Sequence, residues 1–223
     1  MLIVLRMKKL IGLLSAMLLV STIWAQTQEV KAKTLLDKVS AKTKSFKTVS
    51  VDFSYTLQNK KENIEDTFDG SLKLKGNKYN LSLMGANLIF DGKDLYNYMP
   101  DSEEVIITKP NASDENSIDP AKLLTIYETG FKYKYVADKT EAGKQLAVID
   151  LYPIKLDGKK FHTVKLTIDK QKDAITEVLY LGKDGINYLI KVKVMKTDIA
   201  FADKIFTFNT KEHTDVEVID QRK

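Results

Sequence analysis

The chain has 223 residues, a formal net charge of +5 and 43% hydrophobic residues, so it is long enough to bury the core of a single domain. It contains no cysteine, which excludes a disulfide framework, cysteine metal ligands, a cysteine nucleophile and a lipid attached to cysteine. The lysines are scattered among acidic residues rather than clustered, and this pattern argues against a nucleic-acid partner.

Residues 1–25 have the pattern of a cleaved secretory signal peptide. Three basic residues stand among the first nine, the stretch Leu10–Ile23 is largely apolar, and Ala25 is a small residue before a polar sequence. An apolar run of about 14 residues is shorter than the roughly 20 that a membrane-spanning helix needs, so we expect cleavage near Ala25. The three basic residues supply three of the five net charges. The part that remains, residues 26–223, therefore carries +2 and is expected to form one domain.

The exported part begins with a predicted helix and continues with predicted strands. Leu35, Leu36 and Val39 have helical spacing within Val30–Lys44. Apolar and polar residues then alternate with a period of two, which is typical of half-buried strands. The first group of predicted strands is Val51–Leu57, Phe68–Lys75, Tyr79–Leu83, Asn87–Phe90, Leu95–Met99 and Glu104–Thr108.

A polar loop over Lys109–Ser117 interrupts the strands. The pair Asp119-Pro120 is a good start for a short apolar helix, which carries Leu123, Leu124, Ile126 and Tyr127 and ends at Gly130. The strands expected after it are Phe131–Ala137, Gln145–Tyr152, Phe161–Asp169, Ile175–Leu181, Tyr188–Lys196, Phe206–Asn209 and Asp215–Ile219, with a helical turn at Ile199–Asp203.

About ten strands joined by hairpin turns predict an antiparallel meander. Because many strands have one apolar face, the sheet must be closed, paired or covered. With only two sizeable helices available, we expect one large curved sheet whose hollow side is plugged by the N-terminal helix and by the helix of Leu123 and Leu124.

No catalytic site is predicted. His162 and His213 share no metal-ligand spacing, and neither a glycine-rich phosphate loop nor a Gly-x-Ser-x-Gly turn is present. The adjacent pair Glu103 and Glu104 would point to opposite faces of a strand. We therefore expect no catalytic residue, no metal and no cofactor, and a protein that is not an enzyme.

The apolar side chains that face one way on the predicted sheet allow two interpretations. They fill a core, or they line a cavity that holds an apolar ligand between sheet and helices, and periodicity alone does not separate the two. The candidate lining residues are Phe53, Tyr55, Phe68, Leu72, Tyr79, Leu81, Leu83, Met84, Tyr96, Tyr98, Leu123, Leu124, Tyr127, Tyr188 and Ile190.

The sequence resembles the periplasmic outer-membrane lipoprotein carrier proteins over nearly the whole exported part. Four segments carry the resemblance in the family's order: the entry into the first strand at residues 47–55, the second strand at 70–75, the segment Phe90–Tyr98 with its Asp-Gly-Lys, and the last part from Phe206 onward. One position departs from the family pattern: where members commonly have an Arg followed by Pro, this chain has Lys75-Gly76-Asn77-Lys78. We therefore do not carry over the gating role of that Arg.

The resemblance implies a mainly β fold with a few helices, an incomplete, unclosed antiparallel β-barrel covered by an α-helical lid. It also implies a periplasmic monomer without cofactor that receives acylated lipoproteins from an inner-membrane lipoprotein-releasing transporter and delivers them to an unidentified outer-membrane acceptor. Methionines such as Met84 and Met99 suit a cavity that must adapt and release. A lipid-sensing regulatory module of the same fold and a lipid or glycan hydrolase are the alternatives.

Overall fold

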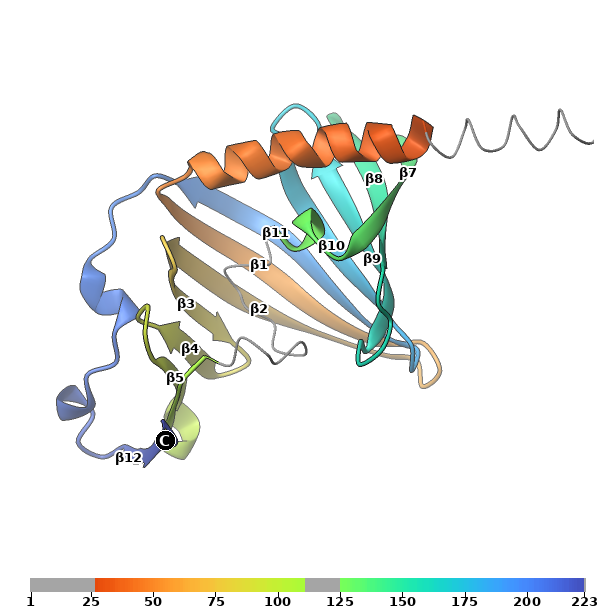
Figure 1. The fold of residues 1–223 in the computed structure, drawn as a ribbon. Helices are drawn as coiled ribbons and strands as arrows, with labels where there is room; N and C mark the ends of the chain where they lie inside the picture. The colour runs from red at the N-terminus through yellow and green to blue at the C-terminus, as the bar shows by residue number, and fades with distance from the viewer. Residues whose placement is uncertain (1–26, 111–124, 223) are drawn as a thin grey trace, which may run out of the picture.

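The computed structural model describes residues 27–110 and 125–222. Its framework is a single curved sheet of 12 strands, and a helix over residues 27–45 lies across one part of that sheet (Figure 1). The two edge strands are β7 and β12, which are not paired with each other. The sheet is therefore open, and the prediction of a mainly β, unclosed sheet is confirmed.

The strands follow one another along the sheet in two runs that meet at β1 and β11. The spatial order is β12-β6-β5-β4-β3-β2-β1-β11-β10-β9-β8-β7, and all neighbours are antiparallel except β12 and β6. The strands are β1 (Thr48–Asn59), β2 (Ile64–Lys75), β3 (Lys78–Leu83), β4 (Ala86–Phe90), β5 (Leu95–Met99), β6 (Glu104–Thr108), β7 (Phe131–Glu141), β8 (Lys144–Pro153), β9 (Phe161–Asp169), β10 (Ala174–Gly182), β11 (Ile186–Thr197) and β12 (Glu217–Asp220).

Short 3-10 helices occupy several connections. They are η1 (Pro100–Ser102), η3 (Ile126–Glu128), η4 (Asp203–Phe206) and η5 (Thr210–Glu212). Two local predictions are wrong: residues 206–209 form no strand, and the helical turn expected at 199–203 lies later, in η4. Phe206 and Phe208 are buried. The apolar residues of this segment alternate because they pack onto the sheet from a connecting segment, and not because the segment is a strand.

The N-terminal helix packs on one half of the sheet. Its apolar stripe of Ala32, Leu36 and Val39 is almost fully buried, as the helical spacing predicts. The stripe contacts a cluster formed with η3 and the strands β7, β8, β9 and β10. This half of the inner face is therefore a filled core.

No helix in the described ranges is both long and apolar enough to cross a membrane.

A separate cluster lies on the opposite face of β4, β5 and β6. The chain after β11 returns along this side of the sheet before it reaches β12 (Figure 1). Phe208 is buried there and its ring contacts those of Tyr96, Tyr98 and His213 at centroid distances of 6.0, 5.0 and 4.6 Å. The returning segment thus covers the outer face of these strands.

Candidate functional site

The other half of the inner face carries a second apolar cluster, which we call the open apolar surface. All its members except Phe46 lie on strands, so the N-terminal helix contributes none of its buried stripe to it. Several members are only half-buried in the structure, whereas the residues under the helix are almost fully buried. The members are Phe46, Val49, Val51, Phe53, Tyr55, Leu72, Leu74, Tyr79, Leu81, Leu83, Leu88, Phe90, Leu95, Ile190, Val192 and Met195.

Strand register explains why these side chains converge. Tyr55 on β1 is directly opposite Phe68 on β2 and Ile190 on β11, and residues opposite each other in a ladder share a face. Phe53 is opposite Gly70. A Cβ atom on Gly70 would lie 2.5 Å from Cζ of Phe53, so the glycine leaves the space that the phenyl ring occupies.

Ten of the candidate residues lie on the inner face, most of them on the open apolar surface, as alternation predicts. They are Phe53, Tyr55, Phe68, Leu72, Tyr79, Leu81, Leu83, Tyr127, Tyr188 and Ile190. Tyr127 differs from the rest because it is 1% exposed in η3 within the filled half. Tyr188 stacks on Tyr55 at 6.1 Å and lies between the two halves.

None of the remaining candidates lies on the open apolar surface in the part of the chain that the structure describes. Tyr96 and Tyr98 face the other side of the sheet, where they pack on Phe208, because the inner-facing residue of β5 is Leu95. Met84 is 59% exposed in the β3–β4 turn and has a positive φ of 52°. Leu123 and Leu124 lie outside the described residues.

Sequence reasoning missed several members of the open apolar surface. Leu88, Phe90 and Leu95 were placed in strands but not on the inner face. The signal was available: because side chains alternate along a strand, the hairpin between β3 and β4 puts Leu88 opposite Leu81. Phe46 and Met195 had no such signal, since one lies in a connection and the other beyond a bulge in β11.

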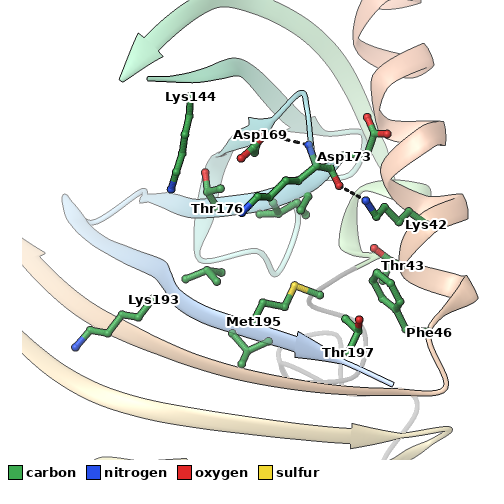
Figure 2. Close-up of a pocket in the computed structure, with 15 residues that line it drawn as sticks. Lys42, Thr43, Phe46, Lys144, Asp169, Asp173, Thr176, Lys193, Met195 and Thr197 are labelled. Carbon is green, nitrogen blue, oxygen red and sulfur yellow. Dashed lines mark hydrogen bonds between the residues drawn. The ribbon is translucent and has the colours of Figure 1, made fainter. Parts of the chain in front are cut away.

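A cavity of about 280 Å³ opens beside the C-terminal end of the helix (Figure 2). Val51, Val192 and Met195 give it an apolar wall that is part of the open apolar surface. Lysines and aspartates from the helix, from three strands and from the β9–β10 turn surround this wall. The charged residues at the cavity are Lys42, Lys144, Lys172, Lys193, Asp169 and Asp173.

Tyrosine hydroxyls on the inner side lie in a largely apolar setting. Burial raises the pKa of Tyr55, and neighbouring Tyr188 acts in the same direction. Burial also raises the pKa of Tyr127. Among the described residues no group of three or more His, Asp or Glu is placed to hold a metal ion.

Lys75, which begins the segment where the sequence departs from the family pattern, forms an ion pair on the outer side of the sheet. Lys75 ends β2, on the face opposite Leu74, and its Nζ lies 2.6 Å from Oδ1 of Asp203 in η4. This ion pair joins β2 to the connection that follows β11. Lys75 therefore does not take part in the open apolar surface.

A single open, largely antiparallel sheet with a helix across its inner face is the class of fold that these elements define. Residues 44–209 match the family described as outer membrane lipoprotein carrier protein LolA, and the chain belongs to this family. The resemblance found in the sequence is thereby confirmed. No curated protein matches the sequence significantly.

Solved structures are similar to this chain at low sequence identity. A conserved uncharacterized protein from Thermus thermophilus is 11% identical with a TM-score of 0.58, and the match covers 86% of this chain and 99% of that chain. LprF from Mycobacterium bovis is 13% identical with a TM-score of 0.47, covering 77% and 96%. A LolA superfamily protein from Nitrosomonas europaea is 14% identical with a TM-score of 0.43, covering 79% and 97%.

Proposed function

We propose that the protein is a periplasmic carrier that binds the acyl chains of lipoproteins on the open apolar surface and shuttles them from the inner to the outer membrane. The observation that carries this proposal is the uneven filling of the inner face. The helix stripe fills the half over β7 to β10, while side chains such as Leu81, Leu83 and Leu88 on the other half stay partly exposed. Membership of the carrier family supports the same conclusion.

The physical chemistry of acyl chains explains why such a surface is useful. Removing an acyl chain from water stabilises a complex by roughly 0.8 kcal/mol per CH₂ group, so a shuttle needs apolar area rather than catalytic groups. It must also release its load. A surface on an open sheet, with flexible side chains such as Met195 beside rigid rings such as Phe53, provides adaptable contacts instead of a closed cavity.

The setting of the carrier is part of the proposal. The signal peptide of residues 1–25 would direct the chain to the periplasm, and residues 26–223 would act as one monomeric domain. Acylated lipoproteins would be received from the inner-membrane releasing transporter and passed to an outer-membrane acceptor. In this scheme the protein performs no reaction and needs no cofactor.

Complex formation with a lipoprotein tests the proposal. Purified protein of residues 26–223 is mixed with a triacylated lipoprotein, and native mass spectrometry measures the species in solution. We expect a soluble complex of one carrier with one lipoprotein. The same lipoprotein with its acyl chains removed should not bind.

Two neighbouring positions on β3 provide matched variants. Leu81 belongs to the open apolar surface, whereas Ser82 points to the other face of the strand. Leu81→Asn should weaken lipoprotein binding at least tenfold, and Ser82→Asn should leave it unchanged. Leu81→Trp, which keeps the site apolar but fills it, should also weaken binding. Full binding by both Leu81 variants, with folding checked by circular dichroism, would contradict the proposal.

A further inference from the structure

The sheet divides next to the cavity. Registered pairing between β10 and β11 covers only Glu177–Leu181 against Lys191–Asn187. Beyond that point the first residues of β10 pair with β9 alone, and the last residues of β11 pair with β1 alone. The cavity lies in this split, with residues 174–176 on one side and residues 192–197 on the other (Figure 2).

A bulge marks each side of the split. Thr176 of β10 has no partner in the register with β9, and Lys193 of β11 has none in the register with β1. Bulges end regular pairing and redirect side chains, and both of these residues line the cavity. The hydroxyl of Thr176 donates to the carbonyl of Thr167 at 3.1 Å, which holds the bulge on the β9 side. The split is thus built into two strands at once.

The cavity joins the open apolar surface to a basic rim. Its apolar wall is shared with that surface through Val51, Val192 and Met195, and Phe46 covers the end near the helix (Figure 2). Around this wall the rim carries four lysines and two aspartates. An occupant that follows the wall outward therefore meets an excess of positive charge.

Two of the four lysines are engaged and two are available. Lys42 donates to the carbonyl of Lys172 at 2.6 Å, and Lys193 forms an ion pair with Asp69. Asp169 accepts from the amides of Gln171 and Lys172, both at 3.0 Å, so its carboxylate is occupied by the β9–β10 turn.

The ammonium groups of Lys144 and Lys172 have no ion-pair or hydrogen-bond partner within residues 27–110 and 125–222. Among the described residues, the rim therefore has two cations without a direct partner close to an apolar wall, and Lys144 has only a longer-range attraction to Glu141 of β7.

We propose that this cavity binds the charged end of an acyl-chain lipid with an anionic headgroup, a carboxylate or a phosphate. The anion lies between Lys144 and Lys172, and the chain continues onto the open apolar surface. The volume of about 280 Å³ is just below the roughly 300 to 1,000 Å³ of typical ligand pockets, so it suits one end of a lipid rather than a whole molecule. The inference rests on the proposed function because it uses the same surface for the chain.

A pair of fluorescent probes separates the charge from the chain. Dansyl-undecanoate and its methyl ester have the same apolar part, but only the first is an anion. At low ionic strength we expect the carboxylate to bind about 3- to 10-fold more tightly than the ester, the effect of two partly exposed charge pairs. The preference should shrink as salt is added, because salt screens such pairs.

Removing the two available charges should abolish this preference. In the double variant Lys144→Gln/Lys172→Gln we expect the two probes to bind equally, with ester affinity unchanged. The matched control Lys132→Gln/Lys134→Gln removes the same charge from exposed positions of β7 and should keep the preference. Competition with lysophosphatidylglycerol against zwitterionic lysophosphatidylcholine tests a phosphate headgroup in the same way, and we expect the former to compete better.

Four outcomes would overturn the inference, and they differ in what they say of the carrier role. Equal binding of both probes by the unmodified protein, or a preference that survives in the Lys144/Lys172 variant, would contradict the anionic subsite while leaving acyl binding intact. Displacement of the carboxylate probe by millimolar inorganic phosphate alone would show a simple anion site without a role for the chain. Failure of both probes to bind would contradict the proposed function as well.

Discussion

Two tyrosine hydroxyls in the filled half of the inner face differ in whether they have a hydrogen-bond partner. The hydroxyl of Tyr180 is buried and has no hydrogen-bond partner in the described part of the chain, and this burial raises its pKa. The hydroxyl of Tyr133 donates to the carbonyl of Tyr127 at 2.7 Å. An unpaired buried polar group destabilises a fold, whereas a satisfied one is close to neutral or favourable.

Removing each hydroxyl should therefore change stability in opposite directions. We expect Tyr180→Phe to raise the free energy of unfolding by about 1 kcal/mol, and Tyr133→Phe to lower it by about 1 kcal/mol. Urea unfolding followed by circular dichroism measures both. A loss of stability in Tyr180→Phe would show that this hydroxyl has a partner, such as a buried water.

Also at the level of single residues, the alternation of apolar and polar side chains predicts most of the inner-face residues correctly. The prediction is wrong where the side chains that face inward are odd-numbered on one strand and even-numbered on another. Tyr79, Leu81 and Leu83 were placed correctly because β3 is regular. Tyr96 and Tyr98 share the chemistry of these residues but have the opposite parity on β5. The register of the β4–β5 hairpin, with Phe90 opposite Leu95, puts Leu95 on the inner face and both tyrosines of β5 on the outer face.

The N-terminal helix is attached to the sheet by a charged contact as well as by its apolar stripe. Asp138 in the second half of β7 accepts from Lys170 at 2.8 Å and from Lys31 of the helix at 3.0 Å, and it also accepts from the hydroxyl of Tyr135. Lys31 lies 3.6 Å from the centre of the Tyr135 ring. Hydrogen bonds from Lys170, Tyr135 and Lys31 lower the pKa of Asp138 well below its ordinary value.

This contact predicts a pH-dependent contribution to stability. Because the pKa of Asp138 is lower in the folded state, its contribution is complete above the unfolded pKa of about 3.9 and is lost as the pH falls through the folded value. Asp138 is half-exposed, so solvent screening limits the effect to about 1 kcal/mol or less. We expect Asp138→Asn to be less stable than the unmodified protein at neutral pH, with the difference shrinking below about pH 4.

Asp37→Asn is the matched control, since Asp37 pairs with Lys33 within the helix at 2.6 Å and forms no ion pair with a second element in the described part of the chain. Its effect should be smaller at neutral pH, as i,i+4 pairs are weak. Thermal unfolding across this pH range measures both variants. A difference for Asp138→Asn that persists unchanged in acid would contradict the assignment.

At the level of elements, the helix and most strands followed from period and turn residues. What the sequence does not encode locally is the pairing of distant segments. Strand β12 was expected, but its parallel pairing with β6 depends on the path of residues 198–216 across the outer face. The split beside β10 was also not predictable, because the bulges at Thr176 and Lys193 leave no mark in the alternation of either strand alone.

The whole molecule must protect both edges of an open sheet, because exposed edges pair with other chains. The edge strand β7 carries exposed lysines at Lys132 and Lys134, which discourage pairing. At the other edge the short strand β12 pairs with β6 and covers its free backbone groups. The amide of Glu217 donates to the carbonyl of Glu103 at 2.7 Å, and that of Gln221 donates to the carbonyl of Ile107 at 2.8 Å.

Removing β12 should therefore make the protein associate with itself. A variant that ends after Asp215 exposes the edge of β6, whose residues Val105 and Ile107 are buried in the native fold. We expect dimers or larger species whose proportion rises with concentration, measured by sedimentation velocity. Glu217→Gln keeps the backbone pairing and changes only a side chain, so it should remain monomeric. A folded, truncated protein that stays monomeric at every concentration would show that β12 does not protect this edge, and that the curvature of the sheet alone prevents pairing.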